Sequence, residues 1–332
     1  MEIKSDGYNQ LGPSAKIIYD EAQKIGIEAK ILNAEKSYLE LSKAGKSFIT
    51  TASRFPFLSA VSSSIACDKE MTNLLIDRAG IQIPGSKKVK TKTEALKIAK
   101  DVGFPLVVKP TKGAHGKGVT SDIKDQKTLE TAVDIAFKYD KEILLEKHCE
   151  GTDYRLLVFN GKVIAALKRI NARIFGDGKS TIEQLIEKEN QNPKRGVKYQ
   201  KPLQKIFIDE DTKEVLENQN MTLESIPKKD QAVKLKSRAN QSLGGEIEEC
   251  TDKVHPDYQK MVVDAAKALN LKLTGADVIT TDITKPLKKT KGVVIEVNDA
   301  PGFQIHHFPT HGKPINVARI VLEYLFNIKN GK

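Results

Sequence analysis

The stretch that most constrains this chain is Gly292-Val-Val-Ile-Glu-Val-Asn298, which the turn sequence 299–302 brings to an end. Its apolar run predicts a buried strand. Residues two apart on a strand point to the same face, so Glu296 and Asn298 would present two oxygen atoms side by side. A second apolar run, 273–279, carries a single acid, Asp277. Three oxygen groups on two neighbouring strands suit a hard cation such as Mg2+, although each group alone is equally compatible with a solvated strand end.

Composition sets broad limits. The chain has 332 residues, 39% hydrophobic and 29% charged, which is enough for two or three lobes with apolar cores. No run of 18 apolar residues is present, so no membrane span is expected. The first residues lack a basic region followed by an apolar one, so no secretory signal is expected. Three widely spaced cysteines fit neither a disulfide framework nor a zinc site, and we expect a cytoplasmic protein.

The formal net charge of +11 raises the question of an anionic partner. A basic excess is typical of proteins that bind nucleic acid, an anionic surface or anionic small substrates. Here lysine far outnumbers arginine, and the lysine clusters at 87–92 and 288–291 lack interleaved aromatic residues. We therefore interpret most of these lysines as solvated surface and do not expect a nucleic-acid partner.

A lysine inside an apolar strand is the clearest sign of a binding site. The predicted strand 104–110 carries Lys109, which is costly to bury without an anionic partner. A glycine-rich loop, 112–118, follows at once and leads into another strand, which argues against a dinucleotide-binding fingerprint. It fits a hairpin whose backbone N–H groups and Lys117 fold over phosphates. Glycines alone would be ordinary turn residues; Lys109 favours the functional interpretation.

Hydrophobic periodicity predicts the remaining elements. Helices are expected over 13–26, 68–79, 93–102, 128–139, 258–269 and 315–325. Strands are expected over 27–32, 142–146, 154–159, 163–167 and 233–238. The last of these would place Lys234, Lys236 and Arg238 on one face. Residues 190–232 are polar and rich in lysine, and we expect an insertion that covers one side of the site.

The segment Gly176-Asp-Gly-Lys-Ser-Thr181 resembles the end of a phosphate-binding motif but fails as one. The first glycine of that motif would stand at Arg173. Ser180-Thr-Ile-Glu183 instead predicts a capping box that begins a helix. The histidines receive no catalytic assignment: His306 and His307 are adjacent and cannot share a strand face, and a loop histidine such as His115 is usually solvated.

Taken in order, these features resemble the ATP-grasp ligases. Within them the chain resembles the ATP-grasp portion of the cyanophycin synthetases, from about residue 11 to about 326. It is also similar to the ATP-grasp domain of the bifunctional glutathione synthetases. The motifs that carry the resemblance are Leu11-Gly-Pro-Ser14, Glu150-Gly-Thr-Asp-Tyr-Arg155, 176–181, Val254-His-Pro256 and Asn298-Asp-Ala-Pro-Gly-Phe303.

The resemblance implies an α+β ATP-grasp fold, with nucleotide held between two α+β lobes and a small N-terminal α/β lobe. The expected units are 1–66, then 67–148 with the glycine-rich lid loop, then 149–332 with the metal site and the insertion near 190–232. The implied chemistry is ADP-forming condensation of a carboxylate with an amine through an acyl phosphate. It implies ATP and two Mg2+ ions, with Mn2+ as an alternative.

Positions that match the family's motifs carry expected roles. Nucleotide phosphates are assigned to Lys69 and Lys109, and the phosphate-covering loop to Gly113, Gly116, Lys117 and Gly118. Adenine is assigned to Glu146, and ribose or substrate to Asp153. The metal ligands are Asp277, Glu296 and Asn298. The catalytic cations are Arg155, which meets a carboxylate or the transferred phosphate, together with Lys236 and Arg238.

Two departures from the family pattern leave the substrate open. The family's Arg-Arg-Asn-Ala-Asn is replaced here by Lys236-Ser-Arg-Ala-Asn240, and Gln304 stands where arginine is common. Cyanophycin synthetases also carry a second ligase domain, for which this chain has no counterpart before Lys332. We expect a ligase of amino acids or short peptides that forms a homo-oligomer. The alternatives are a glutathione synthetase, which adds glycine to γ-glutamylcysteine, and a basic nucleotide- or nucleic-acid-binding protein without ligase activity.

Overall fold

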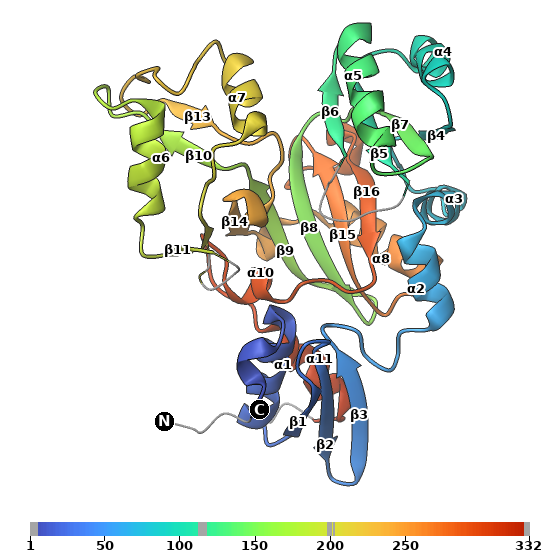
Figure 1. Ribbon diagram of the computed structural model, residues 1–332. Coiled ribbons are helices and arrows are strands. Elements are labelled where there is room, and N and C mark those ends of the chain that lie inside the picture. Colours follow the sequence, from blue (N-terminus) through green and yellow to red (C-terminus); the bar gives the residue numbers. More distant parts are fainter. Residues whose placement is uncertain (1–5, 112–117, 198–200, 202, 329–332) are drawn as a thin grey trace.

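The computed structural model describes residues 6–111, 118–197, 201 and 203–328, which fold into an arrangement of lobes around a central sheet (Figure 1). These residues form a five-stranded, a four-stranded and a three-stranded sheet, with two further two-stranded pairs. Helices pack against the sheets, so the predicted α+β class is confirmed. No helix within the described residues has both the length and the apolar character needed to cross a bilayer.

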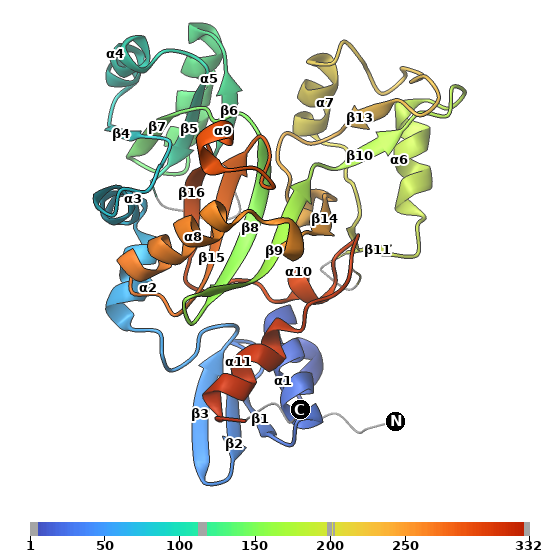
Figure 2. The same ribbon diagram turned by 180° about the vertical axis from the view of Figure 1, so that it is seen from behind.

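The N-terminal lobe also contains the last helix of the chain. Its elements are α1 (Pro13–Lys24), β1 (Glu28–Asn33), β2 (Tyr38–Lys43), β3 (Lys46–Thr51) and α11 (Val317–Leu325). Proline at the first helical position and the buried stripe Ile17, Ile18 and Ala22 explain why α1 forms here. Both views show α11 beside α1, and the two helices share one hydrophobic core with the sheet (Figures 1 and 2).

Two helices lead from this lobe to a four-stranded lobe. They are α2 (Ala60–Cys67) and α3 (Lys69–Arg78), and the Asp68 side chain caps α3 by accepting from two backbone N–H groups. The lobe that follows has strand order β4-β7-β5-β6. Its elements are β4 (Ser86–Val89), α4 (Lys92–Val102), β5 (Leu106–Pro110), β6 (Thr120–Ile123), α5 (Gln126–Phe137) and β7 (Ile143–Lys147).

The largest sheet is antiparallel throughout, in the order β14-β9-β8-β15-β16. Its strands are β8 (Thr152–Phe159), β9 (Lys162–Ile170), β14 (Glu246–Glu249), β15 (Leu273–Thr280) and β16 (Val293–Asn298). Helix α8 (Pro256–Ala268) covers one face of it, as Figure 2 shows. The short helices α9 (Leu287–Thr290) and α10 (Gln304–His307) flank β16 in sequence. The two adjacent strands predicted to carry the oxygen ligands are β15 and β16.

A small unit stands beside the β9 and β14 edge of this sheet (Figure 1). It consists of β10 (Arg173–Phe175), α6 (Ile182–Asn190), β11 (Arg195–Gly196), β12 (Leu203–Gln204), α7 (Glu210–Glu217) and β13 (Ala232–Lys234). Residues of the predicted 190–232 insertion share its hydrophobic core with Ile174, Ile182 and Ile186 on the preceding segment. The unit is therefore held together by its own apolar core.

Two local predictions in this unit are wrong. The capping box is one residue later than predicted, formed by Thr181 and Gln184, because Ser180 donates its hydroxyl to Asp177 instead. The predicted strand 233–238 ends at Lys234, where its pairing with β10 stops. Lys234 is exposed and Lys236 is buried, so the predicted common face of Lys234, Lys236 and Arg238 does not form.

Candidate active site

The buried lysine of β5 has the anionic partner that its burial requires. Lys109 Nζ lies 2.7 Å from Glu146 Oε1 on the adjacent strand β7. Only 13% of the Lys109 side chain and 4% of the Glu146 side chain is exposed. A charge that is costly to bury alone is tolerated when it is paired in this way. The apolar run around Lys109 is thus explained by a specific ion pair.

A second lysine approaches the same place from the start of α3. Lys69 Nζ donates to the Pro110 carbonyl oxygen at 3.2 Å. Burial, and then the positive charge of Lys109, lower the pKa of Lys69, while Glu296 and Glu146 act in the opposite direction. Two lysines and two carboxylates from different elements therefore lie within electrostatic range of one another. Neighbouring ammonium groups repel, and an anion bound between the two lysines would relieve that repulsion.

The predicted phosphate-covering loop is described only at its end. Gly113, Gly116 and Lys117 lie outside the described residues, and their assignment stays a prediction. Gly118 has φ +70°, and a Cβ there would lie 2.7 Å from the Tyr139 ring and 2.9 Å from Pro110. Both the backbone conformation and the space require glycine at this end of the loop.

The oxygen groups on β15 and β16 lie on one face of the large sheet. In the antiparallel register Asp277 pairs with Glu296, and Gly275 pairs with Asn298. Glu296 is exposed and Asn298 is half-buried, and the Nδ2 atom of Asn298 is buried without a hydrogen-bond partner in the described part of the chain. Two carboxylates and an amide oxygen are the donor types that Mg2+ takes. The residues present therefore fit a magnesium site by their chemistry and by their strand register.

The side chain of Asp277 is turned toward arginines in this structure. Arg155 on β8, directly opposite Asp277, donates from Nε to Oδ1 and from Nη2 to Oδ2, the latter at 2.9 Å. Burial opposes ionisation of Asp277, but Arg155 and Arg169 outweigh it and hold the pKa of Asp277 below its usual value. Among the described residues, no three histidine, cysteine or acidic side chains converge as a metal cluster.

Glycine on β15 makes room for Arg155. A Cβ at Gly275 would lie 2.6 Å from Arg155 Nη1 and 3.0 Å from its Cδ. The guanidinium group therefore lies across β15 where a side chain is missing. This close approach orients Arg155 toward Asp277.

Sequence reasoning missed Arg169 on β9. Its Nη1 donates to Asp153 Oδ2 at 3.0 Å and to Asp277 Oδ2 at 3.2 Å. A signal was available, because a β8–β9 hairpin turning at Asn160-Gly161 brings Asp153 and Arg169 close to one another across the two strands. Asp153 was predicted to meet ribose or substrate; in this structure its carboxylate pairs with Arg169.

Lys236 and Arg238, the two other predicted catalytic cations, lie in different environments. Lys236 is 1% exposed, and its Nζ lies 2.6 Å from Asp209 Oδ1 at the N-cap of α7. Lys236 thus already has a carboxylate partner inside the small unit. Arg238 is half-buried beyond the end of β13. Their roles toward substrate stay predictions.

The Pro-Gly-Phe segment after β16 is fixed by the N-terminal lobe. Ser14 Oγ accepts from the Phe303 N–H and donates to Gln304 Oε1, each at 3.1 Å. Arg54 forms a two-point pair with Asp299, with both N···O distances at 3.1 Å. The Leu-Gly-Pro-Ser sequence at residues 11–14 therefore positions a loop that is adjacent in sequence to Glu296 and Asn298.

His306 on α10 is an unusual buried histidine. It is 1% exposed, and neither ring nitrogen has a hydrogen-bond partner in the described part of the chain. Burial, then the charge of Arg155, lowers the pKa of His306 to about 3. Burial also lowers the pKa of His307, to about 4. Both imidazoles are therefore neutral at pH 7, and His306 lies within electrostatic range of Arg155 and Arg169.

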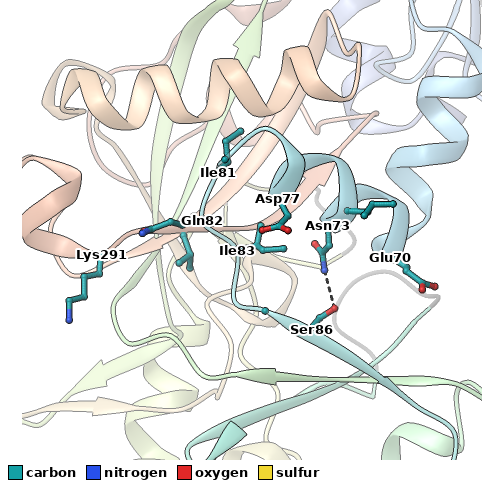
Figure 3. A pocket seen from close by; sticks show the side chains of 12 residues that line it. Glu70, Asn73, Asp77, Ile81, Gln82, Ile83, Ser86 and Lys291 are labelled. Carbon is teal, nitrogen blue, oxygen red and sulfur yellow. Dashed lines mark hydrogen bonds between the residues drawn. The ribbon is translucent and has the colours of Figure 1, made fainter. Parts of the chain in front are cut away.

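An open groove of about 840 Å³ lies elsewhere, along α3 and the segment that leads to β4 (Figure 3). Polar side chains on its wall include Glu70, Asn73, Asp77 and Gln82, and Asn73 donates to Ser86 Oγ at 3.2 Å. None of the predicted site residues that the structure describes lines it. The candidate site is therefore defined by the charged groups above and not by this groove.

Comparison with known proteins identifies relatives of this chain. Residues 77–181 match the family model described as the D-ala D-ala ligase C-terminus. The chain is 38% identical over 329 residues to a cyanophycin synthetase of Synechocystis sp., covering 98% of this chain and 38% of that protein. It is 32% identical over 332 residues to the glutathione biosynthesis bifunctional protein of Clostridium perfringens, covering 98% and 42% respectively.

A solved structure extends the likeness to three dimensions. The crystal structure of a bifunctional glutathione synthetase from Pasteurella multocida matches with a TM-score of 0.73 and 28% identity. The match covers 96% of this chain and 45% of that one. The chain thus spans less than half the length of these relatives.

Proposed function

This chain contains an ATP-grasp ligase domain, and from that premise we propose that it joins a carboxylate to an amine on amino acids or short peptides. ATP-grasp ligases use ATP with Mg2+, and the proposed products are ADP, phosphate and the new amide. The proposed units are residues 1–66, 67–148 and 149–332, with α11 of the last unit packed into the core of the first. The two larger ones would hold the nucleotide between them.

The observation that carries this proposal is the meeting of cations and oxygen ligands from different elements. Lys109 and Lys69 belong to β5 and α3, while Glu296 belongs to β16, and the charge of Glu296 nevertheless influences Lys69. A nucleotide polyphosphate between these elements would meet both lysines on one side and the oxygen ligands on the other. Glu146, adjacent to Lys109, is proposed to meet the adenine.

Each residue has a defined task in the proposed reaction. A carboxylate is a poor electrophile, so it must first be phosphorylated, and that transfer depends on positioning and on cations around the phosphoryl group. Lys69 and Lys109 would hold the phosphates, and Arg155 the carboxylate or the transferred group. When bound, Mg2+ would neutralise phosphate charge; Asp277, Glu296 and Asn298 would hold two such ions.

Water must be kept from the acyl phosphate until the amine attacks it. A closing segment is the usual solution in such enzymes. We assign this task to the glycine-rich loop that ends at Gly118 and to the insertion within the small unit beside β9 and β14. Gly118, which has no space for a side chain, would serve as one end of that loop.

The similar proteins suggest two kinds of product. Likeness to cyanophycin synthetases favours addition of an amino acid to a peptide, and we propose a ligase of this type. Likeness to bifunctional glutathione enzymes supports the alternative, addition of glycine to γ-glutamylcysteine. A nucleotide- or nucleic-acid-binding protein without ligase activity is the third candidate, and the presence of Lys109, Asp277, Glu296 and Asn298 argues against it.

The test is a matrix of amino acids and dipeptides incubated with ATP and Mg2+, scored by nucleotide product and by product mass. We expect ADP and phosphate together with a mass gain equal to one amino-acid residue. Release of AMP and pyrophosphate would contradict the acyl-phosphate route. A gel shift with single-stranded and duplex nucleic acid at low salt tests the third candidate, because such binding is strongest there.

A further inference from the structure

The two oxygens of Asp277 are fully engaged by arginines. Arg155 contributes Nε to Oδ1 and Nη2 to Oδ2, and Arg169 contributes Nη2 to Oδ1 at 3.1 Å and Nη1 to Oδ2 at 3.2 Å. A carboxylate offers about four lone-pair positions. Three hydrogen bonds and the ion-pair contact of Arg169 Nη2 therefore surround both oxygens, and the Asp277 side chain is only 3% exposed. A metal ion must compete with the arginines for Asp277 in this arrangement.

The cluster is electrically balanced without any ligand. Arg169 also pairs with Asp153 at 3.0 Å, so two guanidinium groups face two carboxylates. The arginines come from β8 and β9, and Asp277 lies on the adjoining strand β15. All four groups thus lie on neighbouring strands of one rigid sheet, where short side-chain movements suffice to exchange partners.

We propose that Arg169 is a second substrate-side cation, held with Arg155 on Asp277 until a metal ion displaces them. The proposal rests on the function proposed above. When Mg2+ takes an oxygen of Asp277, Arg155 loses its acceptor and Arg169 keeps only Asp153. Two largely buried guanidinium groups then share one carboxylate, and this uncompensated charge is costly, so they turn to a further anion. Only 21% of the Arg169 side chain is exposed, and the anion available there is the carboxylate or phosphate of the reacting substrate.

Binding of Mg2+ and binding of the substrate anion are thereby coupled. Metal binding makes the site positive and frees N–H groups on two planar guanidinium groups, a kind of donor that can hold a carboxylate or phosphate by two bonds. Without metal, the arginines are neutralised and the site does not attract the anion. The substrate anion therefore binds well only after the metal–nucleotide complex has bound.

The first experiment measures metal dependence without turnover. ADP is titrated into the chain at a series of Mg2+ concentrations, giving the Mg2+ concentration at which the gain in ADP affinity is half-maximal. In Arg169→Gln this concentration should fall about three- to tenfold, because a competing cation is removed from Asp277, an effect of the size of one partly buried ion pair. For Arg169→Lys, this Mg2+ concentration should lie between the values for wild type and Arg169→Gln.

The matched control is Lys168→Gln, the neighbouring residue on β9, whose side chain is 38% exposed and lies 4.0 Å from Glu248. Adjacent strand residues point to opposite faces, so this variant should leave the Mg2+ requirement unchanged. The second readout is binding of inorganic phosphate to the chain with Mg2+ and ADP. Mg2+ should strengthen phosphate binding in wild type and strengthen it several-fold less in Arg169→Gln.

The outcomes separate this inference from the proposed function. An unchanged or raised Mg2+ requirement in folded Arg169→Gln, with normal Mg2+-dependent ADP binding in wild type, would refute the inference and leave the ligase proposal standing. Wild-type ADP binding that does not respond to Mg2+ would contradict both. If Lys168→Gln loses as much phosphate binding as Arg169→Gln, the effect comes from the loss of any positive charge and not from Arg169. That result would also overturn the inference.

Discussion

Asp277 on β15 lies directly opposite Glu296 on β16 in the antiparallel register of the large sheet. Their side chains therefore share one face, although the two residues differ in environment. Asp277 is buried against two arginines, while Glu296 is exposed and within electrostatic range of Lys69. Asp277 thus contacts the arginines of β8 and β9, while Glu296 faces the lysines around β5.

Gly275→Ala should disturb Arg155 without removing it. The new Cβ would lie 2.6 Å from Arg155 Nη1, so the guanidinium group must move and its two-point pair with Asp277 must weaken. We expect kcat/KM to fall about tenfold, which corresponds to about 1.4 kcal/mol of lost interaction. The measurement is steady-state ADP release.

The control for this effect is a double-mutant cycle with Arg155→Ala. If alanine at position 275 acts through Arg155, it should have little further effect once Arg155 is absent. Equal losses in both backgrounds would show that Gly275 serves the strand itself and not the arginine.

Glu146→Leu should destabilise the chain because it leaves Lys109 buried without its carboxylate. Removing one partner of a buried pair typically costs about 3–5 kcal/mol, whereas an apolar replacement of both partners costs far less. We therefore expect the free energy of unfolding to fall strongly in Glu146→Leu and to recover in Lys109→Met/Glu146→Leu. Urea titration measures all three proteins. Additive losses in the double variant would contradict an interacting pair.

Acid should destabilise the chain through His306 and His307. The pKa of each is lowered on folding, to about 3 and about 4, so the unfolded chain binds protons more readily. Stability is therefore present above the ordinary histidine pKa, near 6.5, and is lost as pH falls below it. For His306 alone, the loss between pH 7 and pH 5 should be about 2 kcal/mol.

The check compares urea unfolding at pH 7 and pH 5 for wild type and His306→Asn. The variant should lose about 2 kcal/mol less stability over that interval, since asparagine does not titrate while His307 is unchanged. Burial raises the pKa of Asp153 to about 6, but Asp153 is present in both proteins and therefore cancels in the comparison, and carboxylates with ordinary pKa values stay largely ionised throughout this range. The same pH dependence in both proteins would rule out His306 as its source.

Much of the fold was predictable because its signals are local. The amphipathic stripe of α1, the Asp68 cap of α3 and the Asn160-Gly161 turn each depend on a few neighbouring residues. The helix α2 and the hairpin formed by β2 and β3 were missed. Helix α2 has few buried side chains and a weak apolar pattern, and the hairpin turns through Ala44 and Gly45, a weaker signal than Asn-Gly.

The candidate site was predictable in its residue types but not in its pairings. Lys109 required an anionic partner, yet only the register of β5 and β7 identifies Glu146 as that partner. The Arg169 contacts depend on the hairpin register and on a third strand, β15. Lys236 was expected on an open strand face, and its pairing with Asp209 arises from a fold within the insertion that local patterns do not specify.

The central claim is that β15 and β16 carry a metal site that serves phosphoryl transfer, and Glu296→Gln tests it most directly. The substitution keeps the shape of an exposed side chain and removes only its charge. The fold should therefore change little, while a site built to hold Mg2+ loses a carboxylate ligand. Asn298→Asp is the matched variant, because it adds a carboxylate two residues away on the same face.

The decisive measurement is ADP release as a function of Mg2+ concentration, with thermal unfolding recorded on the same samples. We predict that Glu296→Gln loses turnover by more than about a hundredfold, the size of effect expected when a group that stabilises transferred charge is removed. Its melting temperature should stay near that of wild type, and raising Mg2+ should restore little activity to it and more to Asn298→Asp. A folded Glu296→Gln protein with wild-type turnover and an ordinary Mg2+ dependence would contradict the metal assignment.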